Sequence, residues 1–240
     1  MLTSLIFHRL AIANLTLSIC VISKIRISIK IETMLKTIFC KQLINHILNK
    51  KKILFREKRK MLNQEPYNAA LDYPLFAEKL ACKKLCHKFN QLSPEKMSER
   101  NRLISKILGK TGKVFLIEQP FMCDYGYNIE IGENFGSNHN LLILDPGKVT
   151  FGNNVMIGAN CSFYTTNHPL DPHLRNEYLQ WARPITVEDN VWICSNVVVL
   201  AGVTIGENSV IGAGSIVTKD IPPNSFAVGN PCKVIKKIPV

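Results

Sequence analysis

The 240-residue chain lacks the motifs of several large enzyme classes. It has no Walker or Rossmann glycine pattern, because its one Gly-x-Gly, at 212–214, lies inside a different repeat. It has no Gly-x-Ser-x-Gly elbow, so a serine-hydrolase nucleophile is not expected. Long hydrophobic runs are also missing: the uncharged stretch 10–23 has 14 residues, fewer than the about 18–20 that a membrane-spanning helix needs. We therefore expect no stable membrane insertion.

Acidic residues are scarce at the N-terminus. Residues 1–60 hold thirteen Lys and Arg against two acids, Glu32 and Glu57, whereas residues 61–240 hold seventeen basic and sixteen acidic side chains. Nearly all of the formal net charge of +12 therefore lies in residues 1–60, which we call the basic extension. Residues 61–240 are almost neutral, so no nucleic-acid-binding face is expected on them. The extension suits a signal peptide, an organellar transit peptide, a weak membrane anchor or an upstream segment foreign to the fold, and its role stays open.

Cysteine pairs with metal-binding spacing are missing as well. The eight cysteines stand at positions 20, 40, 82, 86, 123, 161, 194 and 232, and none forms a C-x-x-C pair. Cys82 and Cys86 are four residues apart, on one face of a predicted helix, where we expect them to fill a core. Reduced, structural thiols indicate a cytoplasmic location, and no metal is predicted to be required.

Two helices are predicted ahead of the main repeat. Apolar residues recur at helical spacing over residues 74–90, with lysines on the outer face. Ser93 and Pro94 predict the start of a second helix, as a capping hydroxyl and a proline in the first turn, and Gly109 predicts its end. We expect a short N-terminal helical cap over residues 61–111.

A six-residue period replaces the helical pattern beyond residue 112. Large apolar residues recur every six positions, and mostly small or β-branched residues follow the last six of them four positions later. The first set is Phe151, Ile157, Phe163, Val187, Ile193, Val199, Ile205, Ile211 and Val217, and the second is Val191, Val197, Val203, Ser209, Ser215 and Ile221. Such hexads build a parallel β-helix of about 18 residues per coil. The sequence predicts a mainly β fold, with residues 112–240 as this β-helix.

The repeat is interrupted at residues 165–184, which contain three prolines and no hexads. A rod-like solenoid has no cleft of its own, so a long polar loop extruded from it is a candidate active-site loop. His168 lies in this loop before Pro169, and histidine is suited to remove a proton from a hydroxyl that attacks a thioester. Because no nucleophile motif is present, direct transfer in a ternary complex is favoured.

Eight stretches then carry a family resemblance, namely 121–129, 149–155, 168–172, 184–187, 190–193, 202–206, 210–223 and 229–235. Through them, residues 61–238 resemble the maltose, galactoside and nodulation-factor O-acetyltransferases, a family of hexapeptide-repeat acyltransferases. The resemblance implies a left-handed parallel β-helix with a short N-terminal α-helical cap, an exception to the usual right-handed crossover. It also implies a homotrimer with active sites between subunits, and acetyl-CoA as the co-substrate, lying along the coils.

The resemblance assigns roles to individual residues. His168 aligns with the catalytic base. Positions that hold the acceptor, expected to be a sugar or a similar small molecule, are Asp72, Asp124, Asn138 and Asp145. Positions that contact coenzyme A are Trp192, Ser195, Ala213, Thr218, Lys219, Lys233 and Lys236. The chain departs from the family at Glu188 and Cys194, where a hexad glycine is usual.

Three alternatives stay open at this point. In one of them, the protein is a hexapeptide acetyltransferase with the same donor and base, but it acts on the hydroxyl of a xenobiotic or an amino acid. In another, His139, His168 and His173 bind zinc in a lyase that resembles the γ-type carbonic anhydrases. In the last, the solenoid is an inactive structural protein.

Overall fold

The computed structural model describes residues 56–70 and 72–239, and every structural statement below concerns these residues. The expectations for residues 1–55 lie outside them. Within the described part of the chain, no helix is long and apolar enough to cross a membrane.

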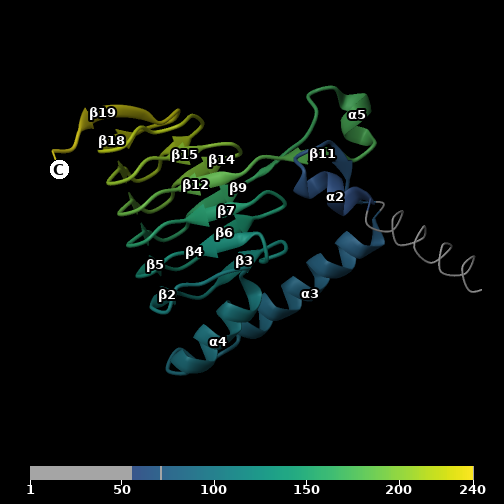
Figure 1. Cartoon of the computed structure of the whole chain (residues 1–240), viewed down its shortest axis with the longest axis horizontal. Coiled ribbons are helices and arrows are strands. Elements are labelled where there is room, and N and C mark those ends of the chain that lie inside the picture. Colours follow the sequence, from purple (N-terminus) through teal and green to yellow (C-terminus); the bar gives the residue numbers. More distant parts are fainter. Residues whose placement is uncertain (1–55, 71, 240) are drawn as a thin grey trace, which may run out of the picture. The chain divides into compact units, whose positions relative to one another are not determined.

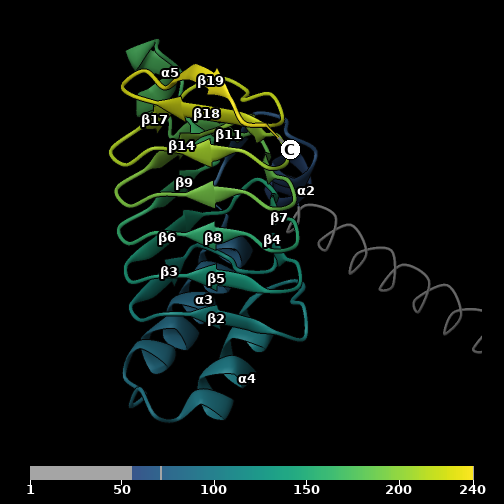
Figure 2. The same cartoon turned by 90° about the vertical axis from the view of Figure 1, so that its left-hand side faces the viewer.

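Three sheets of short strands form the walls of a parallel β-helix, whose coils stack on one another (Figures 1 and 2). The four-stranded sheet consists of β4 (Ile129–Ile131), β7 (Val149–Phe151), β12 (Ile185–Val187) and β15 (Thr204–Ile205). The five-stranded sheet consists of β3 (Phe121–Cys123), β6 (Leu141–Leu144), β9 (Ser162–Tyr164), β14 (Val198–Leu200) and β17 (Ile216–Val217). The seven-stranded sheet consists of β2 (Phe115–Ile117), β5 (Phe135–Ser137), β8 (Met156–Ile157), β13 (Trp192–Ile193), β16 (Val210–Ile211), β18 (Ser225–Val228) and β19 (Lys233–Lys237), the last of them antiparallel.

The core of the β-helix confirms the six-residue repeat. All nine large apolar hexad residues and all six residues that follow four positions later are buried. In the upper coils, Val187 pairs with Ile205 and Val199 with Val217, in each case three hexads further along the chain. The buried rings of Phe135, Phe151 and Phe163 pack on one another at centroid distances of 5.1 and 5.0 Å.

The lower coils are longer than the three hexads expected. Ile131 pairs with Phe151 and Cys123 with Ile143, so each of these coils holds two residues more than three hexads. The two extra residues fall where the five-stranded sheet turns into the four-stranded sheet, in residues 124–128 and again in 145–148. Residues 165–184 leave the β-helix at the same place. We call the five-stranded sheet D, the four-stranded sheet B, and this turn region the D–B corner. All of these insertions stack along it.

A second turn region holds the coils in register through asparagine side chains. Asn134, Asn154, Asn190, Asn208 and Asn224 all have φ between 54° and 58°. The side-chain amide of each of the first four donates to the Oδ1 of the next asparagine, at 2.9–3.0 Å. Asparagine tolerates this left-handed conformation better than most residues.

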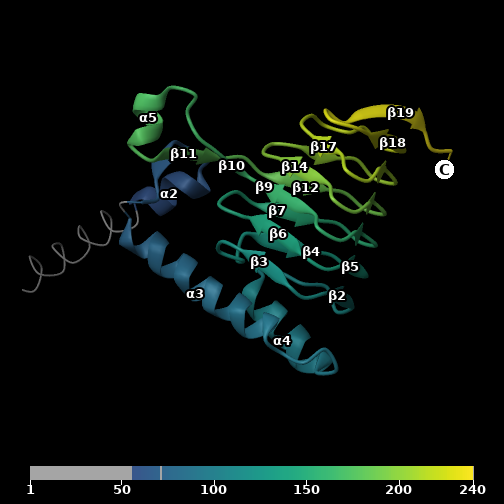
Figure 3. The ribbon, with the colours of Figure 1, turned by 180° about the vertical axis from the view of Figure 1, so that it is seen from behind.

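The helical cap packs against the first coils (Figure 3). It contains α2 (Arg56–Leu62), α3 (Tyr73–Asn90) and α4 (Met97–Ile107). The second predicted helix begins later than expected, because Lys96 is its N-cap and residues 93–96 form a turn in which the Ser93 hydroxyl bonds to Glu95. Gly109 follows the end of α4, where a Cβ would lie 2.2 Å from the Tyr127 carbonyl oxygen.

The predicted boundary between residues 60 and 61 falls inside α2. Residues 56–60, which the sequence pattern assigns to the basic extension, form most of this helix instead. Lys58 Nζ lies 2.7 Å from Glu78 Oε1 on α3, and the Asn68 N–H donates to Glu57 Oε2 at 2.8 Å. These contacts attach α2 to the cap.

The loop 165–184 is more regular than expected. It holds β10 (Thr166–Asn167), α5 (Pro172–Asn176) and β11 (Leu179–Ala182), and β10 and β11 pair as an antiparallel hairpin. On its other side, β11 pairs with β1 (Tyr67–Asn68) of the cap. The cap and the loop are therefore joined by one small three-stranded sheet.

Candidate active site

A cavity of about 720 Å³ lies between the cap, the loop and the D–B corner. Apolar and aromatic side chains make up much of its wall, and a few polar groups face into it. Its lining residues are Ala69, Ala70, Leu75, Phe76, Lys79, Lys83, Asp124, Tyr125, Leu142, Leu144, Pro146, Tyr164, Thr166, His168, Tyr178 and Gln180. Of the predicted catalytic and acceptor-binding residues, His168 and Asp124 line this cavity.

The loop fixes the ring of His168. Its Nδ1 lies 3.1 Å from the carbonyl oxygen of Leu179, on the opposite strand of the hairpin. Because a carbonyl oxygen can only accept, this hydrogen bond places the proton on Nδ1 and leaves the lone pair of Nε2 free to accept a proton. Arg175 Nη1 donates to the carbonyl oxygens of Pro169 and Leu170, at 3.1 and 3.0 Å, and so holds the chain just after His168.

Asp124 is held by a lysine of the cap. Lys79 Nζ on α3 lies 2.8 Å from Asp124 Oδ1, and the Asp124 side chain is 9% exposed. The ion pair joins the cap to the D–B corner at the edge of the cavity. The helical pattern of the sequence places Lys79 on the outer, solvent face of its helix and so misses its contact with Asp124. Only the three-dimensional packing of α3 on β3 brings the two side chains together.

Asp145 lies beneath this site and does not line the cavity. It is fully buried, and its carboxylate accepts from the backbone N–H groups of Asp124, Tyr125 and Gly126, at 2.9, 2.9 and 2.7 Å. Burial raises the pKa of the Asp145 carboxyl to about 6, although these N–H donors act in the opposite direction. The geometry makes Asp145 a positioning residue for the turn that carries Asp124.

Asp72 caps a helix. Its Oδ1 accepts from the Leu75 N–H at 2.9 Å, and it is the N-cap of α3. Leu75 and Phe76, in the first turn of α3, line the cavity. By capping this helix, Asp72 fixes the helix end that forms one side of the cavity. Its own side chain is 7% exposed and is not among the lining residues.

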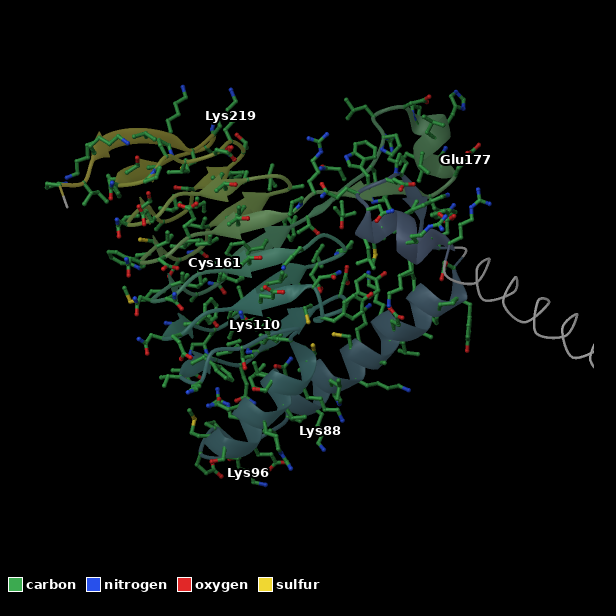
Figure 4. The ribbon with its side chains drawn as sticks, viewed as in Figure 1. Lys88, Lys96, Lys110, Cys161, Glu177 and Lys219 are labelled. Carbon is green, nitrogen blue, oxygen red and sulfur yellow. The ribbon has the colours of Figure 1, made fainter. Side chains whose placement is uncertain are left out.

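The remaining predicted residues lie on other parts of the β-helix. Asn138, Ser195 and Ala213 stack along the turn between the seven-stranded sheet, which we call sheet C, and the five-stranded sheet D. We call this turn the C–D corner. Thr218 and Lys219 follow β17 on the D–B corner. Trp192 faces outward from β13, and Lys233 and Lys236 lie on β19. In Figure 4, Lys219 lies beside β18 and β19, at the far end of the coils from Lys88 and Lys96 on the cap.

One chain therefore does not bring all of the predicted residues together. The C–D and D–B corners lie at opposite ends of the strands of the five-stranded sheet, which have two to four residues each. At about 3.3 Å per residue, a strand of three residues separates them by about 10 Å. Asn138, Ser195 and Ala213 thus lie across a sheet from the cavity that holds His168.

The histidines of the zinc alternative do not gather in one chain. His139 Nδ1 lies 2.7 Å from the Gln119 carbonyl oxygen, on the C–D corner, away from His168 on the D–B corner. Among the described residues, the only three potential ligand side chains whose donor atoms approach one another are cysteines of the cap and first coil.

Comparisons with known proteins agree with this fold. Residues 60–112 match the maltose acetyltransferase hexapeptide capping motif, and residues 184–219 match the bacterial transferase hexapeptide of six repeats. A maltose O-acetyltransferase from Clostridium difficile 630 is 48% identical, over 77% of this chain and 98% of that one, with a TM-score of 0.75.

Two further solved structures contain the coenzyme. A galactoside acetyltransferase in complex with coenzyme A is 42% identical, over 76% of this chain and 91% of that one, with a TM-score of 0.74. A hexapeptide-repeat acetyltransferase from Vibrio cholerae O1 biovar eltor, complexed with acetyl-coenzyme A, is 35% identical, over 77% of this chain and 99% of that one, with a TM-score of 0.71.

The hexad coils, the cap and the loop define a hexapeptide-repeat acyltransferase. Within that class, the chain belongs to the family of the maltose and galactoside acetyltransferases, which confirms the resemblance seen in its sequence. It is an acetyltransferase.

Proposed function

We propose that the protein transfers the acetyl group of acetyl-CoA to a hydroxyl of a sugar or a similar small acceptor, with His168 as the general base. The observation that carries this proposal is the hydrogen bond from His168 Nδ1 to the Leu179 carbonyl oxygen, which selects the tautomer of the neutral imidazole whose Nε2 carries a free lone pair. His168 also lines a cavity of about 720 Å³, a volume that holds a small ligand.

His168 acts in two steps. Nε2 accepts the proton of the acceptor hydroxyl while the hydroxyl oxygen attacks the thioester carbonyl carbon that acetyl-CoA supplies. The resulting imidazolium, still bonded through Nδ1 to Leu179, then returns the proton to the departing thiolate. No covalent intermediate on the protein is needed.

The cavity wall supports a sugar acceptor. The carboxylate of Asp124 accepts hydrogen bonds, and the Lys79 ion pair holds it at the edge of the cavity. Tyr125, Tyr164 and Tyr178 provide apolar ring surface beside it. Because neither carboxylate nor ring is specific for sugars, an acceptor with a xenobiotic or amino acid hydroxyl is the second candidate.

Coenzyme A is proposed to bind along the coils. Trp192 and the C–D corner residues Ser195 and Ala213 are candidates for its pantetheine, and Lys219, Lys233 and Lys236 for its phosphates. The placement of Ser195 and Ala213 on a different corner from His168 supports a homotrimer, in which a neighbouring subunit brings its C–D corner to the cavity. The six free thiols of the described residues support a reducing compartment, and we infer the cytoplasm.

A coenzyme A release screen across sugars, chloramphenicol and serine tests the acceptor class. Release with sugars only is expected, and release with chloramphenicol or serine only would favour the second candidate. Binding of the donor is tested separately: coenzyme A should protect the half-buried thiol of Cys194, next to Ser195, from alkylation as measured by peptide mass spectrometry. Unchanged alkylation of Cys194 would contradict donor binding at the C–D corner.

Subunit complementation tests the shared site. Co-expression of a His168→Ala chain with a Ser195→Arg chain should give mixed oligomers that regain activity, because some sites then combine an intact loop with an intact C–D corner. Each variant alone should be inactive, and light scattering should give three chains per particle. Inactive mixed oligomers would contradict a site shared between subunits.

A further inference from the structure

Three cysteine thiols meet between the cap and the first coil. Cys82 and Cys86 lie one helical turn apart on α3, and Cys123 is the last residue of β3. The Cys123 Sγ lies 3.4 Å from the Cys82 Sγ and 3.7 Å from the Cys86 Sγ, and all three sulfur atoms lie within 4.8 Å of one another. All three residues are buried, as expected for Cys82 and Cys86, but their convergence on Cys123 is not visible in the sequence.

The spacing of the sulfur atoms fits a metal ion. Zinc binds thiolates at about 2.3 Å, so two sulfur ligands of a tetrahedral ion lie about 3.8 Å apart and those of a trigonal ion about 4.0 Å apart. The two sulfur distances to Cys123 lie within a few tenths of an ångström of the tetrahedral value. They are far longer than the about 2.05 Å of a disulfide bond, and all three thiols are free.

A second cavity lies against two of the three cysteines. It has a volume of about 400 Å³, and Cys86 and Cys123 both line it. Lys83, Asn90 and Asp124 line the same cavity, so a water molecule there has polar partners and Lys83 offsets part of the negative charge of three thiolates. The His87 side chain, also in that wall, lies outside the group of mutually close donor atoms.

We propose that Cys82, Cys86 and Cys123 bind one thiophilic d¹⁰ metal ion, Zn²⁺ or Cu⁺, as a structural clip between α3 and the first coil. Three thiolates without a histidine or carboxylate select soft ions of this kind. Binding forms three metal–sulfur bonds and releases the protons of the thiols that are protonated beforehand, with no change of oxidation state.

The position of the clip connects it to the active site. Asp124, which follows Cys123 directly, lines the catalytic cavity, and its partner Lys79 lies one turn before Cys82 on the same helix. A bound ion would therefore fix the distance between the two elements that carry this ion pair. It takes no part in acetyl transfer and lies outside the cavity that holds His168.

Metal titration of the full-length, reduced protein tests the proposal. Zn²⁺ is titrated against a chromogenic zinc chelator, and Cu⁺ in a separate arm against a copper(I) chelator, under anaerobic conditions. Because Cys20 and Cys40 lie outside the described residues, the experiment uses a Cys20→Ser, Cys40→Ser background. One ion per chain should bind in at least one arm, and the arm with the tighter binding identifies the ion.

The decisive variant is Cys86→Ser, with Cys161→Ser, another buried thiol, as its matched control. Removing a residue that hydrogen-bonds to a metal ligand lowers metal affinity by about 10–100-fold. Removing a ligand itself should therefore lower it by more than about 100-fold. Cys161→Ser should bind like the background protein. Equal affinity of all three proteins, or no stoichiometric binding in either arm, would overturn the proposal.

A measurement without variants covers the case in which Cys86→Ser does not fold. The metal-loaded and metal-free proteins are alkylated with iodoacetamide after brief unfolding by heat, and the labelled peptides are counted by mass spectrometry. Metal should protect the peptides of Cys82, Cys86 and Cys123 together and leave Cys161 and Cys232 unprotected. Protection of other cysteines only, or a disulfide between Cys82 and Cys123 in the protein as purified, would overturn it.

Discussion

The Nδ1 atom of His168 lies 3.1 Å from the carbonyl oxygen of Leu179, across a two-stranded hairpin. A backbone carbonyl cannot be removed by substitution and cannot donate, so it holds the imidazole in one tautomer throughout. In many active sites a carboxylate has this role. Here the loop supplies the orienting acceptor from its own backbone, and β1 of the cap holds the hairpin from its other side.

Replacing His168 by alanine should lower kcat by about 100- to 10,000-fold, the usual contribution of a general base. The side chain is exposed, so the melting temperature should stay within about 2 °C of the wild type. Coenzyme A release under saturating acetyl-CoA measures the rate. His173→Ala, five residues further on in α5 and also exposed, is the control and should retain wild-type activity. An equally active His168→Ala enzyme would contradict the mechanism.

Replacing Lys79 by methionine should raise the KM for the acceptor by about tenfold and leave the KM for acetyl-CoA unchanged. The lysine holds Asp124 at the cavity edge; a hydrogen bond to a charged group is worth about 1.5–3 kcal/mol, and because the Lys79 side chain is 38% exposed the lower end of this range applies. Lys83→Met, on the same helix and in the same cavity wall, is the matched control. A double-mutant cycle with Asp124→Asn measures the coupling, and strictly additive effects would show that the pair does not act as a unit.

Much of the β-helix could be predicted from its sequence, because a period of six leaves few other folds. Val187 and Ile205 are spaced by three hexads, and they pair in the coils as the repeat predicts. The longer lower coils could not be predicted in this way, since Asp145 and its neighbours interrupt the period only briefly. A second two-residue insertion, at 124–128, forms the turn that carries Asp124. The departures from the repeat therefore indicate where the candidate active site lies.

The cap was less predictable, because its contacts join residues far apart in the chain. A run of charges from Arg56 to Lys60 reads as solvated linker, yet it belongs to a helix that the Lys58–Glu78 ion pair and the buried side chain of Met61 attach to the cap. Likewise, the i, i+4 spacing of Cys82 and Cys86 predicts one helix face, but nothing local identifies Cys123 as their neighbour. His168 stands out through its loop, whereas its partner, the carbonyl of Leu179, has no side-chain signature.

Replacing Asp145 by alanine should lower the free energy of unfolding by about 3–5 kcal/mol, because three buried N–H groups lose their acceptor. Asp145→Asn keeps part of this bonding and should cost less. Urea unfolding at pH 7, followed by circular dichroism at one protein concentration, measures both losses. A loss below about 1 kcal/mol in the alanine variant would contradict the positioning role.

The same residue gives a pH dependence whose sign is set by its raised pKa. The folded state holds the Asp145 proton up to about pH 6, whereas an ordinary carboxyl loses it near pH 3.8. The part of the stability that depends on this proton is fully present below pH 3.8 and is lost as pH rises to 6, by about 3 kcal/mol in all, whereas the hydrogen bonds from the three N–H groups remain. The stability advantage of the wild type over Asp145→Asn should shrink between pH 4 and pH 6, and a pH-independent difference would contradict it.

Asn190 tests the asparagine ladder, since it both accepts from Asn154 and donates to Asn208 at 3.0 Å with φ 57°. Asn190→Gly loses the two side-chain hydrogen bonds but keeps the left-handed backbone, and should cost about 1–2 kcal/mol of unfolding free energy. Asn190→Ala loses both and should cost about 1 kcal/mol more, because a Cβ disfavours that conformation. Urea denaturation measures both variants. Equal losses would show that the ladder bonds alone hold this turn, and a more stable alanine variant would contradict the left-handed requirement.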